Sequence, residues 1–197
     1  MIRGRTPVNH FTVAEYVAIE AVSTERHEFW FGKIYAMAGG SLEHSLVAQQ
    51  VGSQLEQALR DRPCAAFQSD ARVAVLADGQ YFYADAFVAC APIAYDAHDE
   101  LACANPVVVV EVLSPSTADY DRGEKLDAYR ANAHLKDILL IDIEARSVEH
   151  WFRKGEGWDR VTRRTGAAPL HVGVEVSVEA LWGKLGLLGG KGTAGLT

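Results

Sequence analysis

The run of apolar residues PVVVVEVL at positions 106–113 constrains the fold of this chain more than any other segment. Valine-rich runs of this length are typical of strands that are covered on both faces of a sheet. The segment therefore predicts a core strand with other elements packed on either side of it. The Ser114-Pro115 step that follows is a turn signal, so we expect the strand to end there.

Glu111 lies near the carboxyl end of this predicted strand. A buried carboxylate without a partner is costly, so it must be protonated, paired or bound to a cation. Open α/β sheets place their ligand sites at the carboxyl ends of strands, which makes Glu111 a candidate site residue. The structural alternatives are a buried ion pair and a strand-end acid that reaches solvent.

Length and charge restrict the function classes. The chain has 197 residues, 49% of them apolar, which suits a single globular domain over residues 1–185. We expect the glycine-rich residues 186–197 to form a flexible tail. The net charge of −7 argues against a protein that coats nucleic acid through a broad basic face. It is compatible with an enzyme that uses metal ions to neutralise phosphates.

The cysteines and the amino terminus bear on the compartment. The chain has three cysteines, Cys64, Cys90 and Cys103. An odd number without a C-x-x-C pair predicts reduced thiols and a cytoplasmic setting. The first residues show no apolar stretch typical of a signal peptide. No apolar run is long enough to span a bilayer, so we expect no membrane association.

Periodicity and turn signals predict an α/β fold, with a mixed central sheet flanked by helices. Ser41 is a good helix N-cap, and an Asp78-Gly79 step is typical of a hairpin. The predicted helices cover residues 12–21, 41–62, 118–132 and 177–185. The predicted strands cover residues 27–38 with a turn at 32–33, 65–76, 80–90, 106–113, 138–143, 147–154 and 158–164.

A second acid, Asp85, lies in the middle of the predicted strand 80–90, before the Glu111 strand in the sequence. Two acids on adjacent strand ends can hold one hard cation through oxygen ligands. The alternative is an acid at a strand edge that points into water.

An Asp followed after a spacer by a Glu on a hydrophobic strand resembles the PD-(D/E)XK nuclease superfamily. More closely, the chain resembles its Uma-type restriction endonuclease family, over nearly all residues up to about position 185. Each matching segment is weakly specific, but their order and spacing together are specific. The match is carried by TVAEY at 12–16, HEFWFGKI at 27–34, residues 37–39 with His44, SDARV at 69–73, residues 105–117, and YDRGEK at 120–125 with Tyr129.

The resemblance implies a restriction-endonuclease-like fold, DNA as the substrate and a homodimer as the working form. It also implies that Asp85, Glu111 and the carbonyl of Val112 hold Mg²⁺, with Mn²⁺ as a possible substitute. Lys125 would orient or deprotonate the attacking water. Its structural alternative is a solvated helix lysine paired with Asp121 at i−4.

The chain departs from the family pattern at three positions. Ala84 replaces the proline expected before the first acid, and Lys33 stands where an acid is usual. Leu113 replaces the lysine expected two residues after the glutamate, so the lysine would come from the next helix, as Lys125.

Glu28 and His44 are the remaining catalytic candidates. Glu28 would position the metal or the lysine, and a surface acid is the alternative. The positive end of the helix begun by Ser41 disfavours protonation of His44, so we expect a neutral imidazole that binds substrate or a water. A capping or packing histidine is the alternative. We interpret Asp70 as structural and Tyr129 as a core or supporting residue.

Two other functions fit the same residues. A nuclease fold retained as a dimerising or nucleic-acid-binding module would need no cation between Asp85 and Glu111. A metal hydrolase acting on a small phosphate ester would need a closed pocket beside these acids.

Overall fold

The computed structural model describes residues 10–37, 39–76, 79–115 and 117–189. The α-helices are α1 (Val13–Glu20), α2 (Leu42–Ala58), α3 (Ala118–Tyr120), α4 (Leu126–Ala131) and α5 (Val178–Trp182). A π-helical segment, η1 (Asp121–Lys125), joins α3 to α4, and a 3-10 helix, η2 (Leu185–Leu188), follows α5. The strands are β1 (His27–Trp30), β2 (Lys33–Ala36), β3 (Cys64–Gln68), β4 (Arg72–Leu76), β5 (Gln80–Phe82), β6 (Ala86–Cys90), β7 (Ala102–Cys103), β8 (Pro106–Leu113), β9 (Asp137–Asp142), β10 (Ser147–Lys154), β11 (Gly157–Arg163), β12 (Ala167–Pro169) and β13 (Glu175–Ser177).

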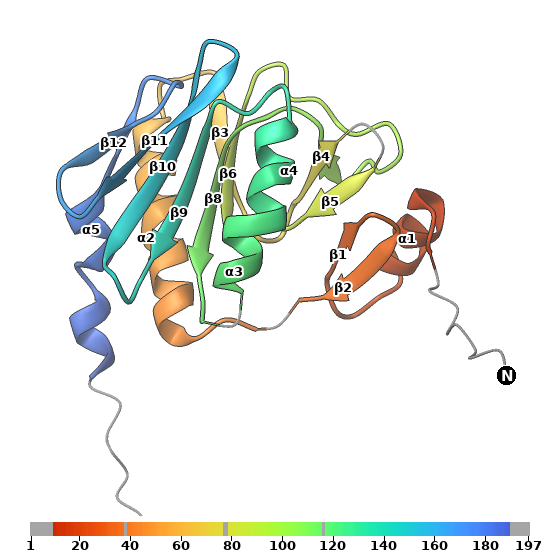
Figure 1. The fold of residues 1–197 in the computed structure, drawn as a ribbon, viewed down its shortest axis with the longest axis horizontal. Helices are drawn as coiled ribbons and strands as arrows, with labels where there is room; N and C mark the ends of the chain where they lie inside the picture. Colours follow the sequence, from red (N-terminus) through yellow and green to blue (C-terminus); the bar gives the residue numbers. More distant parts are fainter. Residues whose placement is uncertain (1–9, 38, 77–78, 116, 190–197) are drawn as a thin grey trace, which may run out of the picture.

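The valine-rich segment forms β8, which lies inside a six-stranded mixed sheet of order β11-β10-β9-β8-β6-β3. It pairs parallel with β9 and antiparallel with β6. Val108 and Val110 pack into the core that contains the α2 residues, whereas Val109 packs into the core that contains the α4 residues. Figure 1 shows the two helices on opposite faces of the sheet. The predicted mixed sheet with helices on both sides is confirmed.

The helix and strand starts follow local signals. The Ser41 hydroxyl accepts a hydrogen bond from the His44 N–H at 3.2 Å and caps α2 as expected. Thr12 and Glu15 form a reciprocal capping box at the start of α1. Phe31 and Gly32 take positive φ angles at the predicted turn between β1 and β2.

The prediction of single strands over 65–76 and 80–90 is wrong, because each divides into two strands. The first half of one and the second half of the other, β3 and β6, pair in the six-stranded sheet. The two halves between them, β4 and β5, form a hairpin in a separate five-stranded sheet of order β2-β1-β5-β4-β7. Residues 77–78 of the predicted hairpin turn lie outside the described residues. Asp85 is consequently not in mid-strand: it lies at the bend where the chain passes from one sheet to the other.

The predicted helix 118–132 is also divided. Gly123 has a non-helical backbone (φ −101°, ψ −107°), so the chain is kinked within η1, between α3 and α4. At the carboxyl end, the predicted tail begins within the 3-10 helix η2, and residues 190–197 lie outside the described part.

The prediction of reduced thiols is wrong for two of the three cysteines. Cys64 on β3 and Cys90 on β6 stand directly opposite each other and form a disulfide, whereas Cys103 is a buried free thiol. Sequence spacing does not reveal such a pair, because the register between the two strands brings the side chains together. Within the described ranges, no helix has both the length and the apolar character needed to cross a membrane.

Candidate active site

The two predicted metal ligands lie near each other, Asp85 directly before β6 and Glu111 on the neighbouring strand β8. Ala86, the first residue of β6, stands opposite Val110 of β8. Asp85, one residue earlier, therefore lies beside the end of β8 that carries Glu111. The Asp85 Oδ2 atom accepts a hydrogen bond of 2.7 Å from the Val112 N–H, which fixes the bend to the strand.

Glu111 is buried on the α4 side of the sheet, with only 4% of its surface exposed. Its Oε1 atom accepts hydrogen bonds from the Tyr129 hydroxyl at 2.5 Å and from the Lys125 ammonium, whose Nζ lies 2.9 Å away. Both donors come from the helix that follows β8. The other carboxylate oxygen, Oε2, takes no part in these contacts.

Lys125 lies at the end of η1 and is 4% exposed. Its Nζ atom is 2.8 Å from Glu28 Oε1 and 2.9 Å from Glu111 Oε1, so the ammonium bridges two carboxylates from different sheets. The alternative of a solvated helix lysine is wrong. Burial would lower the pKa of Lys125, but the carboxylates of Glu111 and Glu28 outweigh that effect and hold it well above its usual range. Lys125 is therefore an ammonium at neutral pH.

Glu28 on β1 is buried, which rules out the surface-acid alternative. Besides Lys125, its carboxylate accepts a hydrogen bond of 3.3 Å from the Tyr83 N–H. The site is thus built where the two sheets meet, with Glu28 from β1, Asp85 from the connecting bend and Glu111 from β8.

His44, in the first turn of α2, approaches the site from the opposite face. Its Nε2 atom is 3.3 Å from Asp85 Oδ2, and its ring also hydrogen-bonds the backbone of Val112. The hydrogen bond with Asp85 raises the pKa of His44, and burial opposes this rise. The Asp85 contact thus shifts the pKa of His44 in the direction opposite to the one expected from the helix end.

Sequence reasoning missed Asp121 as a site residue, since it considered this acid only as a surface partner of Lys125. Asp121 is buried in η1, and its side chain is hydrogen-bonded by Thr117. Burial raises the pKa of Asp121, while Lys125 and Thr117 counteract the rise. The signal in the sequence was its position one helical turn before Lys125, which places both side chains on one face.

The site carries more acids than bases. The charges of four carboxylates, those of Glu28, Asp85, Glu111 and Asp121, act on one another, and a single ammonium, that of Lys125, lies among them between Glu28 and Glu111. Burial raises the pKa of Glu111 well above its usual range, the Lys125 charge opposes the rise, and the neighbouring acids add to it. Such an excess of negative charge is relieved by protons or by a cation.

The donor set fits a hard divalent cation. His44 interacts with both the Asp85 carboxylate and the Val112 backbone, so these two groups converge on one imidazole. Carboxylate and carbonyl oxygens are the ligands that Mg²⁺ prefers, with water in the remaining positions. Over the described ranges, no three His, Cys, Asp or Glu side chains form a preassembled metal site. The donors present are therefore two carboxylates and a carbonyl.

Other charged residues have structural partners. Asp70 forms an ion pair with Arg26 (2.5 Å), in agreement with its interpretation as structural. Arg153 donates to the backbone carbonyls of Arg130 and Asn132 at the end of α4.

Comparison with known proteins gives consistent results. Residues 13–181 match the family model Uma2, described as "Putative restriction endonuclease". Two uncharacterized proteins of Synechocystis sp. (strain ATCC 27184 / PCC 6803 / Kazusa) are similar in sequence. The protein sll1609 is 34% identical over 145 residues, which are 74% of this chain and 82% of that protein. The protein slr1290 is 32% identical over 151 residues, which are 77% and 78% of the two chains.

A solved structure shares the fold. The crystal structure of a "putative nuclease belonging to DUF820" from Anabaena variabilis ATCC 29413 superposes with a TM-score of 0.71. The similarity covers 87% of this chain and 97% of that chain, at 17% sequence identity.

Proposed function

Because the chain belongs to the Uma2 family, described as "Putative restriction endonuclease", we propose that it is a Mg²⁺-dependent endonuclease that hydrolyses phosphodiester bonds in DNA. The observation that carries the proposal is the cluster of four carboxylates at the junction of the two sheets, where Lys125 bridges Glu28 and Glu111. A divalent cation would offset part of this negative charge and allow an anionic phosphate to approach.

Asp85, Glu111 and the Val112 carbonyl would hold Mg²⁺, with Mn²⁺ as a substitute. Bound there, the ion would neutralise charge on the phosphate and favour ionisation of a water. His44 would then release Asp85 and donate to the substrate or to a water. The resemblance to restriction enzymes also leads us to propose a homodimer, whose two sites would serve the two DNA strands.

Lys125 would act as a donor and not as a base, because its raised pKa keeps it an ammonium. Its hydrogens would hold the attacking water and stabilise the charge that develops on the phosphate in the transition state. Glu28 would position Lys125. The Tyr129 hydroxyl would fix the Glu111 carboxylate by donating a hydrogen bond to its Oε1 atom.

A non-catalytic role is the second candidate, and one observation favours it. Hydrogen bonds already connect Lys125 to Glu28 and Tyr129 to Glu111, and His44 contacts Asp85. The fold itself therefore needs no cation. The chain would then be a nuclease fold retained for dimerisation or nucleic-acid binding.

Plasmid cleavage in Mg²⁺ or Mn²⁺ tests the proposal, with wild type beside Glu111→Ala and the exposed Glu56→Ala as the matched control. We expect wild type and Glu56→Ala to nick or linearise the plasmid, and Glu111→Ala to be inactive. Binding of DNA by wild type without cleavage in either metal would support the non-catalytic role. Hydrolysis of p-nitrophenyl phosphate without DNA cleavage would support the small-ester alternative.

A further inference from the structure

The two edges of the six-stranded sheet are chemically different. The edge strand β11 carries the exposed charged residues Asp159 and Arg160, which is how natural sheets prevent edge-to-edge pairing. The opposite edge strand, β3, has the sequence CAAFQ, without a charged residue, proline or glycine. This edge therefore lacks the usual protection against pairing with another strand.

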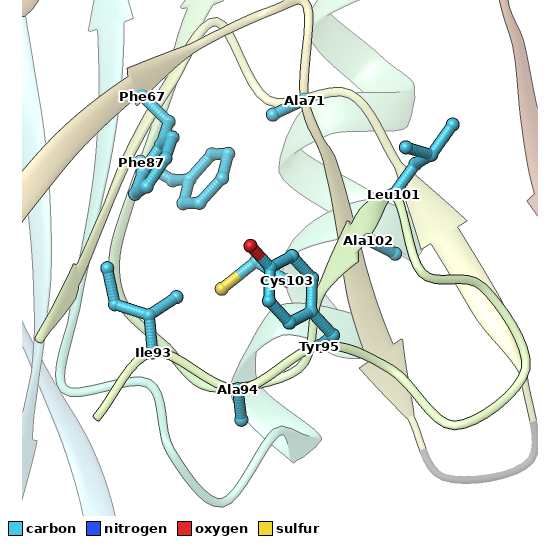
Figure 2. Close-up of a pocket in the computed structure, with 9 residues that line it drawn as sticks. All are labelled: Phe67, Ala71, Phe87, Ile93, Ala94, Tyr95, Leu101, Ala102 and Cys103. Atoms are coloured by element: carbon cyan, nitrogen blue, oxygen red, sulfur yellow. The ribbon is translucent and has the colours of Figure 1, made fainter. Parts of the chain in front are cut away.

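A hollow lies beside the β3 edge. Its volume is about 180 Å³, and Figure 2 shows the rings of Phe67 from β3 and Phe87 from β6 along one side of it. The two rings stack with centroids 4.8 Å apart. Tyr95 and Leu101, which line the hollow, are 72% and 70% exposed. The same surface thus offers an apolar hollow and large apolar side chains that lie in solvent.

The charges at the two ends of β3 are opposite. Arg62 precedes the strand, Asp70 follows it, and both are exposed. Within one chain, Arg62 donates to the Gly173 carbonyl and Asp70 pairs with Arg26. If two copies of β3 paired antiparallel about Ala66, Arg62 of each would lie near Asp70 of the other. A parallel pairing would instead bring like charges together, so antiparallel pairing is favoured.

We propose that β3 and the adjoining hollow form a two-fold interface between two copies of this chain. A two-fold interface uses the same patch on both subunits, which must therefore be complementary to itself. The β3 edge meets this requirement through its backbone donors and acceptors and its end charges. The hollow and the exposed Tyr95 and Leu101 provide an apolar centre. The partner that covers the β3 edge and the hollow is thus a second copy of the chain.

The interface does not depend on catalysis, so it can be tested apart from the proposed nuclease activity. Sedimentation velocity at micromolar concentration should give a mass of two chains for wild type. Leu101→Glu should weaken dimerisation about ten-fold or more, because it places a charge in the apolar centre. Val161→Glu on β11 is the matched control and should leave the dimer intact. Leu101 is exposed, and circular dichroism should show that both variants are folded.

Hydrogen exchange provides a second measurement. Raising the protein concentration should slow exchange of the β3 amides, while the β11 amides stay unchanged. The proposal is overturned if wild type is a monomer, if Leu101→Glu remains as dimeric as wild type, or if the protection appears on β11.

Discussion

The cluster around Arg72 and the cluster around Lys125 both bury charged side chains, and they differ in charge balance. In the five-stranded sheet, Arg72 pairs with Asp99 through two contacts of 2.6 and 2.9 Å and also contacts Glu20 and Tyr83. His27 completes this cluster by contacting Glu20 at 3.0 Å. Two acids are thus met by an arginine and a histidine. At the junction of the sheets, the charges of four acids act on one another beside one lysine, which bridges Glu28 and Glu111, and His44 contacts Asp85.

Burial of charge does not by itself mark a functional site. The Arg72 cluster is paired and needs nothing from outside the protein. The Lys125 cluster has an excess of carboxylates, and the pKa values of Glu111 and Asp121 are raised there. A perturbed acid with too few bases nearby is the better indicator of a site.

The largest expected effect is on cleavage and comes from the loss of the Lys125 ammonium. Lys125→Ala should lower the cleavage rate by about 10²-fold or more, as the removal of a transition-state donor does. Lys125→Met keeps the apolar stem and should lose the same activity. The exposed Lys184→Ala serves as the control. Plasmid assays that find wild-type rates in both Lys125 variants would refute the catalytic role.

Substitutions in the Arg72 cluster should lower the stability of the protein and leave its cleavage rate unchanged. Arg72→Met leaves Asp99 and Glu20 buried without their base, so we expect a loss of about 3–5 kcal/mol in unfolding free energy. Urea unfolding measures this loss, and cleavage per folded molecule should stay near the wild-type value. A loss of cleavage beyond the unfolded fraction would mean that the two clusters act together.

Tyr129→Phe should have a smaller effect, because it removes one donor to Glu111 and keeps the ring. A hydrogen bond to a charged group contributes about 1.5–3 kcal/mol, and that is the expected loss of unfolding free energy. Tyr35, which is exposed, gives the matched control Tyr35→Phe. Equal stabilities of the two variants would show that the Glu111 contact does not hold the site.

The smallest effect should depend on pH. The pKa of His44 is raised by Asp85, so its stabilising contribution is complete below the unfolded value of 6.5. The contribution is lost as the pH rises through the folded value. The difference in unfolding free energy between wild type and His44→Gln should therefore be largest at acidic pH and shrink at alkaline pH. A difference that does not change with pH would contradict the Asp85–His44 contact.

The sequence predicts features that local patterns determine. The valine run of β8, the Ser41 cap and the helix that carries Lys125 are visible because apolar periodicity and capping act over a few residues. The family resemblance adds the association of Asp85, Glu111 and Lys125, which no local pattern connects.

Other features depend on contacts between distant segments. The chain crosses between two sheets near Asp85 because each half of its predicted strand finds a different partner strand. The raised pKa of His44 likewise depends on Asp85, and the disulfide depends on the register of β3 against β6. These contacts exist only once the strands are paired, so local patterns could not predict them.

The central claim is that the excess of carboxylates at the sheet junction binds a divalent cation. Calorimetric titration with Mn²⁺ tests it directly, on wild type, Asp85→Asn and Asp70→Asn, whose acid is exposed and paired with Arg26. We predict saturable binding to wild type and to Asp70→Asn, and an affinity at least about ten-fold lower for Asp85→Asn. Absence of binding by wild type, or equal binding by Asp85→Asn, would contradict the account.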